Sequence, residues 1–193
     1  MWKTDYIKED TLTEFKGTYK GNLPVIWNDE YKHLDYTRES FNDPESITKW
    51  KKQHYTVANF VGKMADFRKK QPDFTKEITK YFSNKYQWKD VGASYYVMGT
   101  CDILPNHKDL YARYKQVYEL WHGEDIWRAI VFLEDRKQGH ILEIEGEVLN
   151  WKAGDYVMWK NDAEHAAANI GIDPRYTLQI TGWTDAGQDG MDR

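Results

Sequence analysis

Apolar residues recur with two different periods along the chain, and the change falls near residue 90. From about Asp43 to Ser83 the spacing is helical, and the Asn42-Asp43-Pro44 start supplies a cap followed by a proline in the first turn. A buried stripe is expected on this helical region at Val57, Phe60, Val61, Met64 and Phe67. After the Gln71-Pro72 break, a second helix is predicted from about Phe74 to Phe82.

From about Trp88 onward the chain consists of short segments rich in β-branched and aromatic residues, separated by Gly, Asn and Asp. Turn signals stand at Glu145-Gly146 and at Ala153-Gly154-Asp155. We expect strands near Ala93 to Ile103, Arg128 to Leu133, Ile141 to Ile144, Glu147 to Trp151, Tyr156 to Trp159, His165 to Asn169 and Tyr176 to Trp183. This pattern predicts a mainly β fold, a double-sheet antiparallel barrel or jelly roll with helices against one outer face.

The length of 193 residues suits one ordinary domain. We expect a single domain over 1–193, with an N-terminal helical appendage and support helices over 1–90, a β core over 91–185 and a flexible tail over 186–193. Apolar residues form 40% of the chain and aromatic residues 16%. That composition is typical of a folded protein and excludes a disordered one.

The charge balance narrows the classes of partner. The formal net charge is −4, which argues against broad electrostatic attraction to nucleic acid or an anionic membrane, although a local basic patch stays open. The single cysteine, Cys101, excludes an intrachain disulfide and a cysteine-based zinc site. No apolar run approaches the roughly 18 residues that span a bilayer, and the first ten residues lack an apolar signal segment. We therefore expect a soluble protein of the cytoplasm, with no membrane partner.

Three histidines are followed two positions later by an acidic residue, which is the spacing of a metal-binding pair: His33-Leu-Asp35, His107-Lys-Asp109 and His122-Gly-Glu124. His33 lies far from the predicted strands and fits a surface loop. His122 stands beside a turn glycine and is kept as a runner-up ligand. His107 follows the first strong strand, and the spacing aims its ring and the Asp109 carboxylate toward the same side. A loop histidine paired with Asp109 without metal is an equal alternative on this motif alone.

A second histidine, His165, stands ten residues before Arg175. Two imidazoles and one carboxylate bind Fe(II) on one face and leave positions open for a co-substrate and O2. A strand starting at Arg175 would present a polar face with Arg175, Thr177, Gln179 and Thr181, opposite Tyr176, Leu178 and Ile180. Such a face is either the solvent side of a half-exposed strand or a pocket wall on which Arg175 and Thr177 bind a carboxylate.

Taken together, these residues resemble a known family, the Fe(II)/2-oxoglutarate-dependent oxygenases, whose fold is a double-stranded β-helix of the jelly-roll type. The resemblance covers roughly Ala93 to Trp183 and implies that 91–185 form such a catalytic core. The wider context is similar to a branch common in phages of cyanobacteria, and it is also similar to the aspartyl/asparaginyl β-hydroxylases. The segments that carry this likeness are Trp127 to Asp135, Gly139 to Ile144, Trp151 to Asp155 and His165 to Gly171.

The resemblance implies a role for each matching position. His107, Asp109 and His165 would bind the iron, and Arg175 with the Thr177 hydroxyl would hold the distal carboxylate of 2-oxoglutarate. Arg128 matches a second arginine of the β-hydroxylase branch, and Tyr96 could donate a hydrogen bond to the co-substrate. The alternatives are a rim residue for Arg128 and a core ring for Tyr96. His140 and Asn169 are further candidates around the site, although a strand-edge histidine and a turn-capping asparagine are commoner uses.

The implied activity is that of a dioxygenase which uses Fe(II), 2-oxoglutarate and O2 to hydroxylate a C–H bond, with succinate and CO2 as co-products. Ascorbate could support turnover. The substrate is a peptide side chain, an amino acid or a small metabolite, and in a phage-encoded protein it would be met in the host cytoplasm. Two departures matter: Asp109 is present where the β-hydroxylases usually lack a metal carboxylate, and only Arg193 follows Arg175, whereas the nucleic-acid dealkylating branch has a second arginine.

Two other classes of protein share the expected fold. One is a non-catalytic jelly-roll protein with a binding or structural role, and the other is a cupin-like metalloenzyme that does not use 2-oxoglutarate. Retention of all three ligand types together with Arg175 argues against the first. In a cupin-like metalloenzyme that does not use 2-oxoglutarate, Arg175 would have no assigned role. Formation of succinate distinguishes all three.

Overall fold

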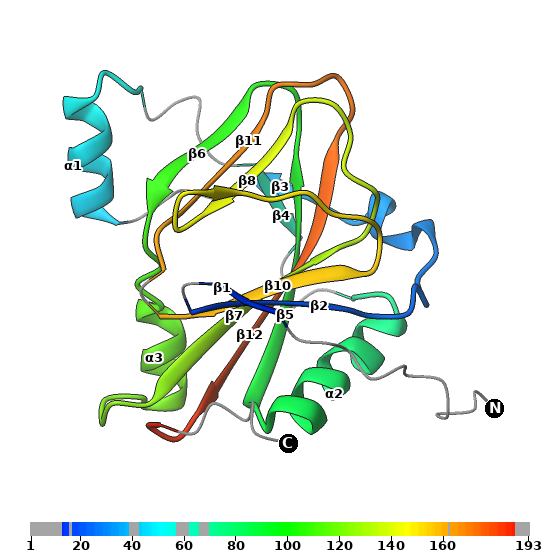
Figure 1. The fold of residues 1–193 in the computed structure, drawn as a ribbon, viewed down its shortest axis with the longest axis vertical. Coiled ribbons are helices and arrows are strands. Elements are labelled where there is room, and N and C mark those ends of the chain that lie inside the picture. The colour runs from blue at the N-terminus through cyan, green and yellow to red at the C-terminus, as the bar shows by residue number, and fades with distance from the viewer. Residues whose placement is uncertain are drawn as a thin grey trace.

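The computed structural model describes residues 13–15, 17–38, 43–56, 62–65, 70–161 and 163–187. Within these ranges the chain forms two antiparallel sheets that face each other, with helices on the outside (Figure 1). The helices are η1 (Asp29–His33), α1 (Pro44–Lys52), α2 (Phe74–Tyr86) and α3 (Ala112–Tyr118). The predicted mainly β, two-sheet architecture is confirmed.

The large sheet has eight strands and the small sheet has four. In spatial order the large sheet contains β1 (Thr13–Phe15), β2 (Thr18–Asn22), β10 (Asp155–Lys160), β7 (Asp125–Phe132), β12 (Arg175–Thr184), β5 (Lys89–Met98), β4 (Lys63–Ala65) and β3 (Thr37–Arg38). The small sheet contains β6 (Asp102–His107), β11 (His165–Asn169), β8 (His140–Ile144) and β9 (Glu147–Val148). From β5 to β12 the chain passes back and forth between the sheets, so residues from both meet in the interior.

The alternation of side chains along the strands gives the large sheet two different faces. Its outer face packs on α2, where Leu178 and Ile180 of β12 join an aromatic cluster around Phe82 and Trp88. The inner face packs on the small sheet through Ile130 and other apolar residues. Arg175 and Thr177 lie on β12 out of phase with Leu178 and Ile180, as the sequence predicted, and both are buried.

The prediction of one long helical region was wrong in its middle. Asp43 caps α1 by accepting hydrogen bonds from the backbone of Glu45 and Ser46, but α1 ends at Lys52. Met64 belongs to β4, whose residues pair with Tyr95, Tyr96 and Val97 of β5. Long-range pairing therefore decides this segment against its local helical spacing. The other predicted stripe positions, Val57, Phe60, Val61 and Phe67, lie outside the described residues.

The first ninety residues are also not a purely helical appendage. They supply β1 to β4, all of which belong to the large sheet. The predicted strand from Ala93 to Ile103 is two strands, because Cys101 adopts a positive φ of 68° in a turn between β5 and β6. The predicted strand from Glu147 to Trp151 is limited to the two residues of β9. Of the expected tail, 186 and 187 are described, and 188–193 are not.

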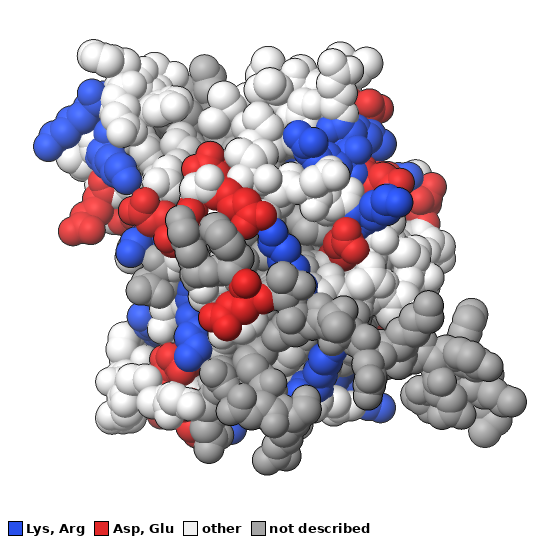
Figure 2. Space-filling model, in the orientation of Figure 1, with Lys and Arg blue, Asp and Glu red and all other residues white. Residues whose placement is uncertain are grey.

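The surface carries both signs of charge. On the face in Figure 2 the described Lys and Arg residues are interspersed with Asp and Glu, rather than gathered in one continuous basic area. No helix within the described ranges has the length and apolar character that crossing a membrane requires.

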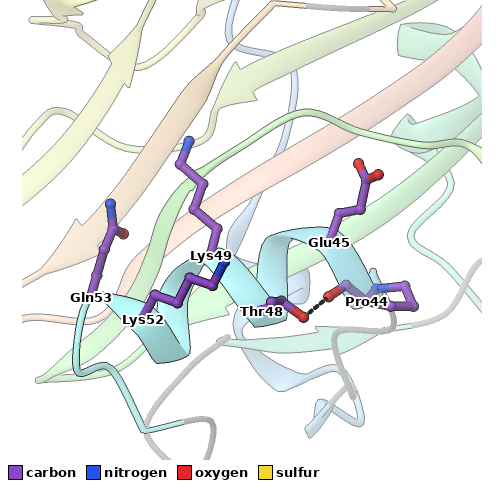
Figure 3. A pocket seen from close by; sticks show the side chains of 6 residues that line it. All are labelled: Pro44, Glu45, Thr48, Lys49, Lys52 and Gln53. Carbon is purple, nitrogen blue, oxygen red and sulfur yellow. Dashed lines mark hydrogen bonds between the residues drawn. The ribbon is translucent and has the colours of Figure 1, made fainter.

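An open hollow of about 610 Å³ lies along α1 (Figure 3). Its lining comes from α1 and the residue after it: Pro44, Glu45, Thr48, Lys49, Lys52 and Gln53. Helical spacing puts these residues on the side of α1 away from the buried Trp50. The hollow is thus separated from the sheet interior by the helix itself.

Candidate metal centre

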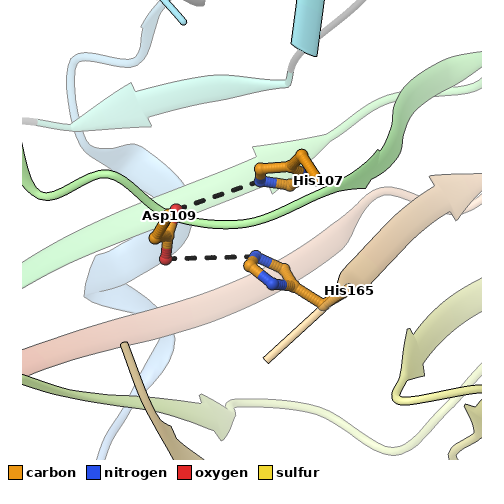
Figure 4. A group of neighbouring side chains, drawn as sticks. All are labelled: His107, Asp109 and His165. Carbon is orange, nitrogen blue, oxygen red and sulfur yellow. Dashed lines mark ion pairs between the residues drawn. The ribbon is translucent and has the colours of Figure 1, made fainter. Parts of the chain in front are cut away.

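Two histidines stand side by side on the small sheet. His107 is the last residue of β6 and His165 the first of β11, and the two are direct partners across the strands. Their ring centroids are 4.3 Å apart, and both side chains are buried (Figure 4). The register of β11 against β6 shifts just after His165, between His165 and Ala167.

Asp109 completes the group from the segment after β6. Its Oδ1 lies 3.9 Å from Nε2 of His107, and its Oδ2 lies 3.9 Å from Nε2 of His165 (Figure 4). One ligand atom from each of the three residues lies within 4.8 Å of the others. In the part of the chain that the structure describes, this is the one group of three or more His, Cys, Asp or Glu residues with such spacing.

The hydrogen bonds of the rings fix which nitrogen can bind a metal. Nδ1 of His107 lies 2.9 Å from the carbonyl oxygen of Pro105, and Nδ1 of His165 lies 3.1 Å from that of Ala163. A carbonyl oxygen only accepts, so each ring donates from Nδ1 and keeps the lone pair on Nε2. Both lone pairs therefore face the Asp109 carboxylate at a distance too long for a hydrogen bond. Lone pairs from two imidazoles and one carboxylate directed at one space form a ligand set for a divalent metal ion, and Fe(II) is one that fits it.

The electrostatics hold two of these groups in the protonation state that a metal needs. Burial, and then the neighbouring His165, lower the pKa of His107 to about 4, so its imidazole is neutral at pH 7. For Asp109, burial by itself would raise the pKa. The cationic Arg128 and the two histidines outweigh that effect and hold the pKa of Asp109 well below its usual range. Asp109 is a carboxylate throughout the physiological range.

Arg128 reaches this centre from the large sheet. It lies on the inner face of β7, where its Nε donates to Oδ2 of Asp109 at 3.0 Å and its NH1 donates to the Thr181 hydroxyl at 2.7 Å. Its guanidinium also lies 4.9 Å from the ring centroid of Tyr111. The sequence suggested Arg128 as a co-substrate residue, and among the described residues it contacts Asp109, Thr181 and Tyr111.

Arg175 is a buried cation that lacks an anionic partner among the described residues. Its side chain is about 5% exposed, its guanidinium lies 5.6 Å from the Trp151 ring and its NH1 lies 2.9 Å from Sδ of Met98. Its Nε has no hydrogen-bond partner, and burial lowers the pKa of Arg175 to about 10. A carboxylate ligand would satisfy both the charge and the unused donor.

Thr177 and Tyr96 share the inner face with Arg175. Thr177 pairs directly with Tyr96 of β5, and Arg175 pairs with Met98 two residues along. Paired residues of an antiparallel sheet point to the same side, so all of these side chains border the interior. The structure thus brings every predicted site residue to the inner side of the two sheets, in two groups: one at Asp109 and one at Arg175.

The remaining candidates lie outside this cluster of three residues. His122 is exposed in a loop whose backbone is held by Glu124, and His33 is exposed at the end of η1. His140 is buried, and its Nε2 lies 2.9 Å from the carbonyl oxygen of Asp173. The Asn169 amide donates to the carbonyls of Met98 and Asp173, which ties the turn before β12 to the end of β5.

Two contacts behind the histidines have no signal in the sequence. Trp50 of α1 donates from Nε1 to the carbonyl oxygen of Asn106 at 3.1 Å, and its ring lies edge-on to His107. Asn106 in turn donates from Nδ2 to Glu164 at 2.9 Å. The residues that precede the two histidines are therefore bonded to each other, which fixes the alignment of the pair. Only the folded chain brings these positions together.

Comparison with known proteins gives a likeness of structure alone. No family model and no curated protein matches the sequence. Among solved structures, the chain is similar to the non-heme α-ketoglutarate-dependent epimerase SnoN from nogalamycin biosynthesis, with 11% identity and a TM-score of 0.55 over 88% of this chain and 76% of that one. A second SnoN structure, with Fe3+, α-ketoglutarate and nogalamycin RO, gives 11% identity and a TM-score of 0.54 over 88% and 79%.

The non-heme α-ketoglutarate-dependent carbocyclase SnoK is similar at 12% identity, with a TM-score of 0.52 over 90% of this chain and 84% of that chain. At such identities the likeness establishes the fold. The two facing sheets form the double-stranded β-helix that the sequence predicted.

Proposed function

We propose that the protein is an Fe(II)- and 2-oxoglutarate-dependent dioxygenase. The observation that carries the proposal is the convergence of two imidazole lone pairs and one carboxylate, from His107, His165 and Asp109, on one buried space. These three residues would hold the iron. When bound, Fe(II) would supply the oxidative decarboxylation of 2-oxoglutarate by O2. That reaction yields succinate and CO2 and drives oxidation of a substrate C–H bond.

The chain's own residues give the co-substrate a place. Arg175 offers a desolvated guanidinium with an unused Nε donor, which suits the distal carboxylate of 2-oxoglutarate. The Thr177 hydroxyl on the same face would donate a second hydrogen bond, and the Tyr96 hydroxyl is a further donor. Burial at this position excludes water, so each of these bonds contributes more than it would at the surface.

The structural neighbours support the reaction class. SnoN and SnoK are both described as non-heme and α-ketoglutarate-dependent, and SnoN has been observed with Fe3+ and α-ketoglutarate. One is an epimerase and the other a carbocyclase, so the fold accommodates several outcomes at the substrate carbon. For this chain we propose hydroxylation of a peptide side chain, an amino acid or a small metabolite. An enzyme of the phage branch would act in the cytoplasm of the host.

Both rival functions leave an observation without a cause. A non-catalytic jelly-roll protein has no use for two buried histidines and a carboxylate in this arrangement. A cupin-like metalloenzyme without 2-oxoglutarate leaves the buried charge of Arg175 without an anion. The dioxygenase accounts for both.

The test measures iron binding, co-substrate binding and turnover separately. Purified protein with Fe(II) and 2-oxoglutarate, kept free of O2, should show a charge-transfer absorbance. On addition of O2 and ascorbate it should form succinate slowly even without the prime substrate. His165→Ala should abolish both signals. His122→Ala is the matched control, because it removes an exposed histidine outside the cluster and should change neither signal.

Each rival predicts a different result. Fe(II) binding without 2-oxoglutarate binding or succinate would favour the cupin-like metalloenzyme. Absence of Fe(II) binding would favour the non-catalytic protein and refute the proposal. Mass spectrometry of host lysate, treated with and without the enzyme, would then search for substrates that have gained one oxygen atom.

A further inference from the structure

The Asp109 carboxylate is held from the opposite sheet. The two histidines of the centre belong to β6 and β11 of the small sheet, whereas Asp109 lies in the segment that leaves β6. Its ion pair is with Arg128 on β7 of the large sheet, with Nε and Oδ2 3.0 Å apart. The side chains of this pair are only 14% and 18% exposed. The contact therefore connects a ligand-bearing segment to the facing sheet in a largely desolvated place.

Arg128 is itself fixed in orientation. Thr181 of β12 is its direct cross-strand partner, and the Thr181 hydroxyl accepts from NH1 at 2.7 Å. The Tyr111 ring packs against the guanidinium at 4.9 Å. A planar guanidinium with two of its nitrogens engaged presents its donor in one direction. Arg128 therefore binds Oδ2, and not Oδ1, of the Asp109 carboxylate.

We propose that Arg128 is the positioning residue of the metal centre: it occupies Oδ2 of Asp109 and leaves Oδ1 as the oxygen that binds the metal. The inference rests on the proposed metal centre at His107, Asp109 and His165. It assigns to Arg128 a role that acts through Asp109, in place of the co-substrate contact that the sequence suggested. The ion pair keeps the carboxylate in place before any metal arrives.

The sign of one measurement separates positioning from simple charge. A cation near a divalent metal repels it, so removal of Arg128 would tighten metal binding if charge were its only effect. Removal of a positioning partner has the opposite effect, because residues that orient a ligand typically contribute about 10- to 100-fold to metal affinity. Weaker binding after loss of a positive charge is therefore the signature of positioning at a pH where Asp109 stays ionised.

The experiment titrates the metal-free full-length chain with Co(II), without 2-oxoglutarate, and follows visible absorption. We expect Arg128→Met to weaken Co(II) binding by about 10- to 100-fold. Arg128→Lys keeps the charge but loses the planar guanidinium, so its Co(II) affinity should lie between those of the unaltered protein and Arg128→Met. Thr181→Val, which removes only the support of NH1, should weaken binding by about threefold.

Lys160→Met is the matched control. Lys160 lies on the adjacent strand β10, and its Nζ forms an ion pair with Asp125 at 3.0 Å that is also partly buried. Its ion-pair partner is Asp125 and not Asp109, so Co(II) affinity should stay within about twofold of the unaltered protein. Urea unfolding of each variant, measured without metal, would show whether a loss of affinity follows a loss of stability.

A second pair of variants makes the test stricter. In an Asp109→Ala background the carboxylate is gone and Arg128 retains only its charge, so Arg128→Met should now tighten the residual binding by the two histidines. Unchanged or tighter binding by Arg128→Met with Asp109 present would overturn the inference while leaving the metal centre intact. Absence of Co(II) binding to the unaltered protein would refute the metal centre and the inference with it. If Arg128→Met does not fold, unchanged affinity in Arg128→Lys and Thr181→Val would overturn the inference.

Discussion

Replacement of Arg175 by methionine should make the metal-free protein more stable and its co-substrate binding weaker. Burial lowers the pKa of Arg175 from its usual value to about 10, and the folded state therefore disfavours the charge. At about 1.4 kcal/mol per pKa unit, the buried cation costs about 3 kcal/mol of folding stability. That cost is fully present at pH 7, below the folded pKa, and decreases progressively as the pH rises from about 10 toward the higher pKa of the unfolded chain.

Arg175→Met removes the charge but keeps an unbranched apolar stem against Trp151. The lost cation–π contact with Trp151 offsets part of the gain, at about 0.5–2 kcal/mol, so the free energy of unfolding should rise by about 1–2 kcal/mol. Binding of 2-oxoglutarate should lose at least one charge-assisted hydrogen bond, worth about 1.5–3 kcal/mol. The dissociation constant should therefore increase about tenfold or more.

Two assays test the two expected effects of Arg175→Met, a gain in stability and a loss of affinity for 2-oxoglutarate. Urea unfolding without metal, followed by tryptophan fluorescence at pH 7, gives the stability, and an oxygen-free absorbance titration of the Fe(II) complex gives the affinity for 2-oxoglutarate. Arg136→Met is the control, because Arg136 lies 5.8 Å from the Trp151 ring but is exposed, and it should change both values little. If Arg175→Met lost stability and kept the affinity, Arg175 would be a structural residue and the reasoning would fail.

Two further predictions concern stability without metal. The free energy of unfolding should fall by up to about 3 kcal/mol as the pH drops from 6.5 to about 4. In this range His107 is protonated in the unfolded chain but stays neutral in the folded protein, where it is buried. Urea unfolding across this range should show a flatter profile for His107→Gln, and an equally steep one would contradict the assignment. Gly139→Ala should cost about 2–3 kcal/mol more than Gly146→Ala. The two glycines have similar φ of 85° and 81°, but a Cβ at Gly139 would meet the backbone nitrogen of Gly171 at 2.1 Å, whereas Gly146 faces open space. Equal losses would show that the backbone conformation alone matters at both positions.

The sequence by itself determined the features that depend on short-range spacing. The alternation over Arg175 to Ile180 separates Arg175 and Thr177 from Leu178 and Ile180, because successive residues of a strand point to opposite faces. That the polar face borders the space between the sheets was decided by the fold. The spacing of His107 and Asp109 likewise places both near the end of one strand. The chemistry of the candidate site was visible because a ligand set is defined by residue types, which the sequence states directly.

The tertiary structure alone decided which distant residues meet. Met64 has helical spacing with its neighbours, yet pairing with Tyr96 makes its segment a strand. The register of β7 against β12 sets Arg128 beside Thr181 and brings it to Asp109, a contact that the sequence did not predict. Such outcomes depend on strand register and on contacts between residues that lie from 19 to 53 positions apart in the chain. Their free energies arise from packing and pairing that no local pattern contains.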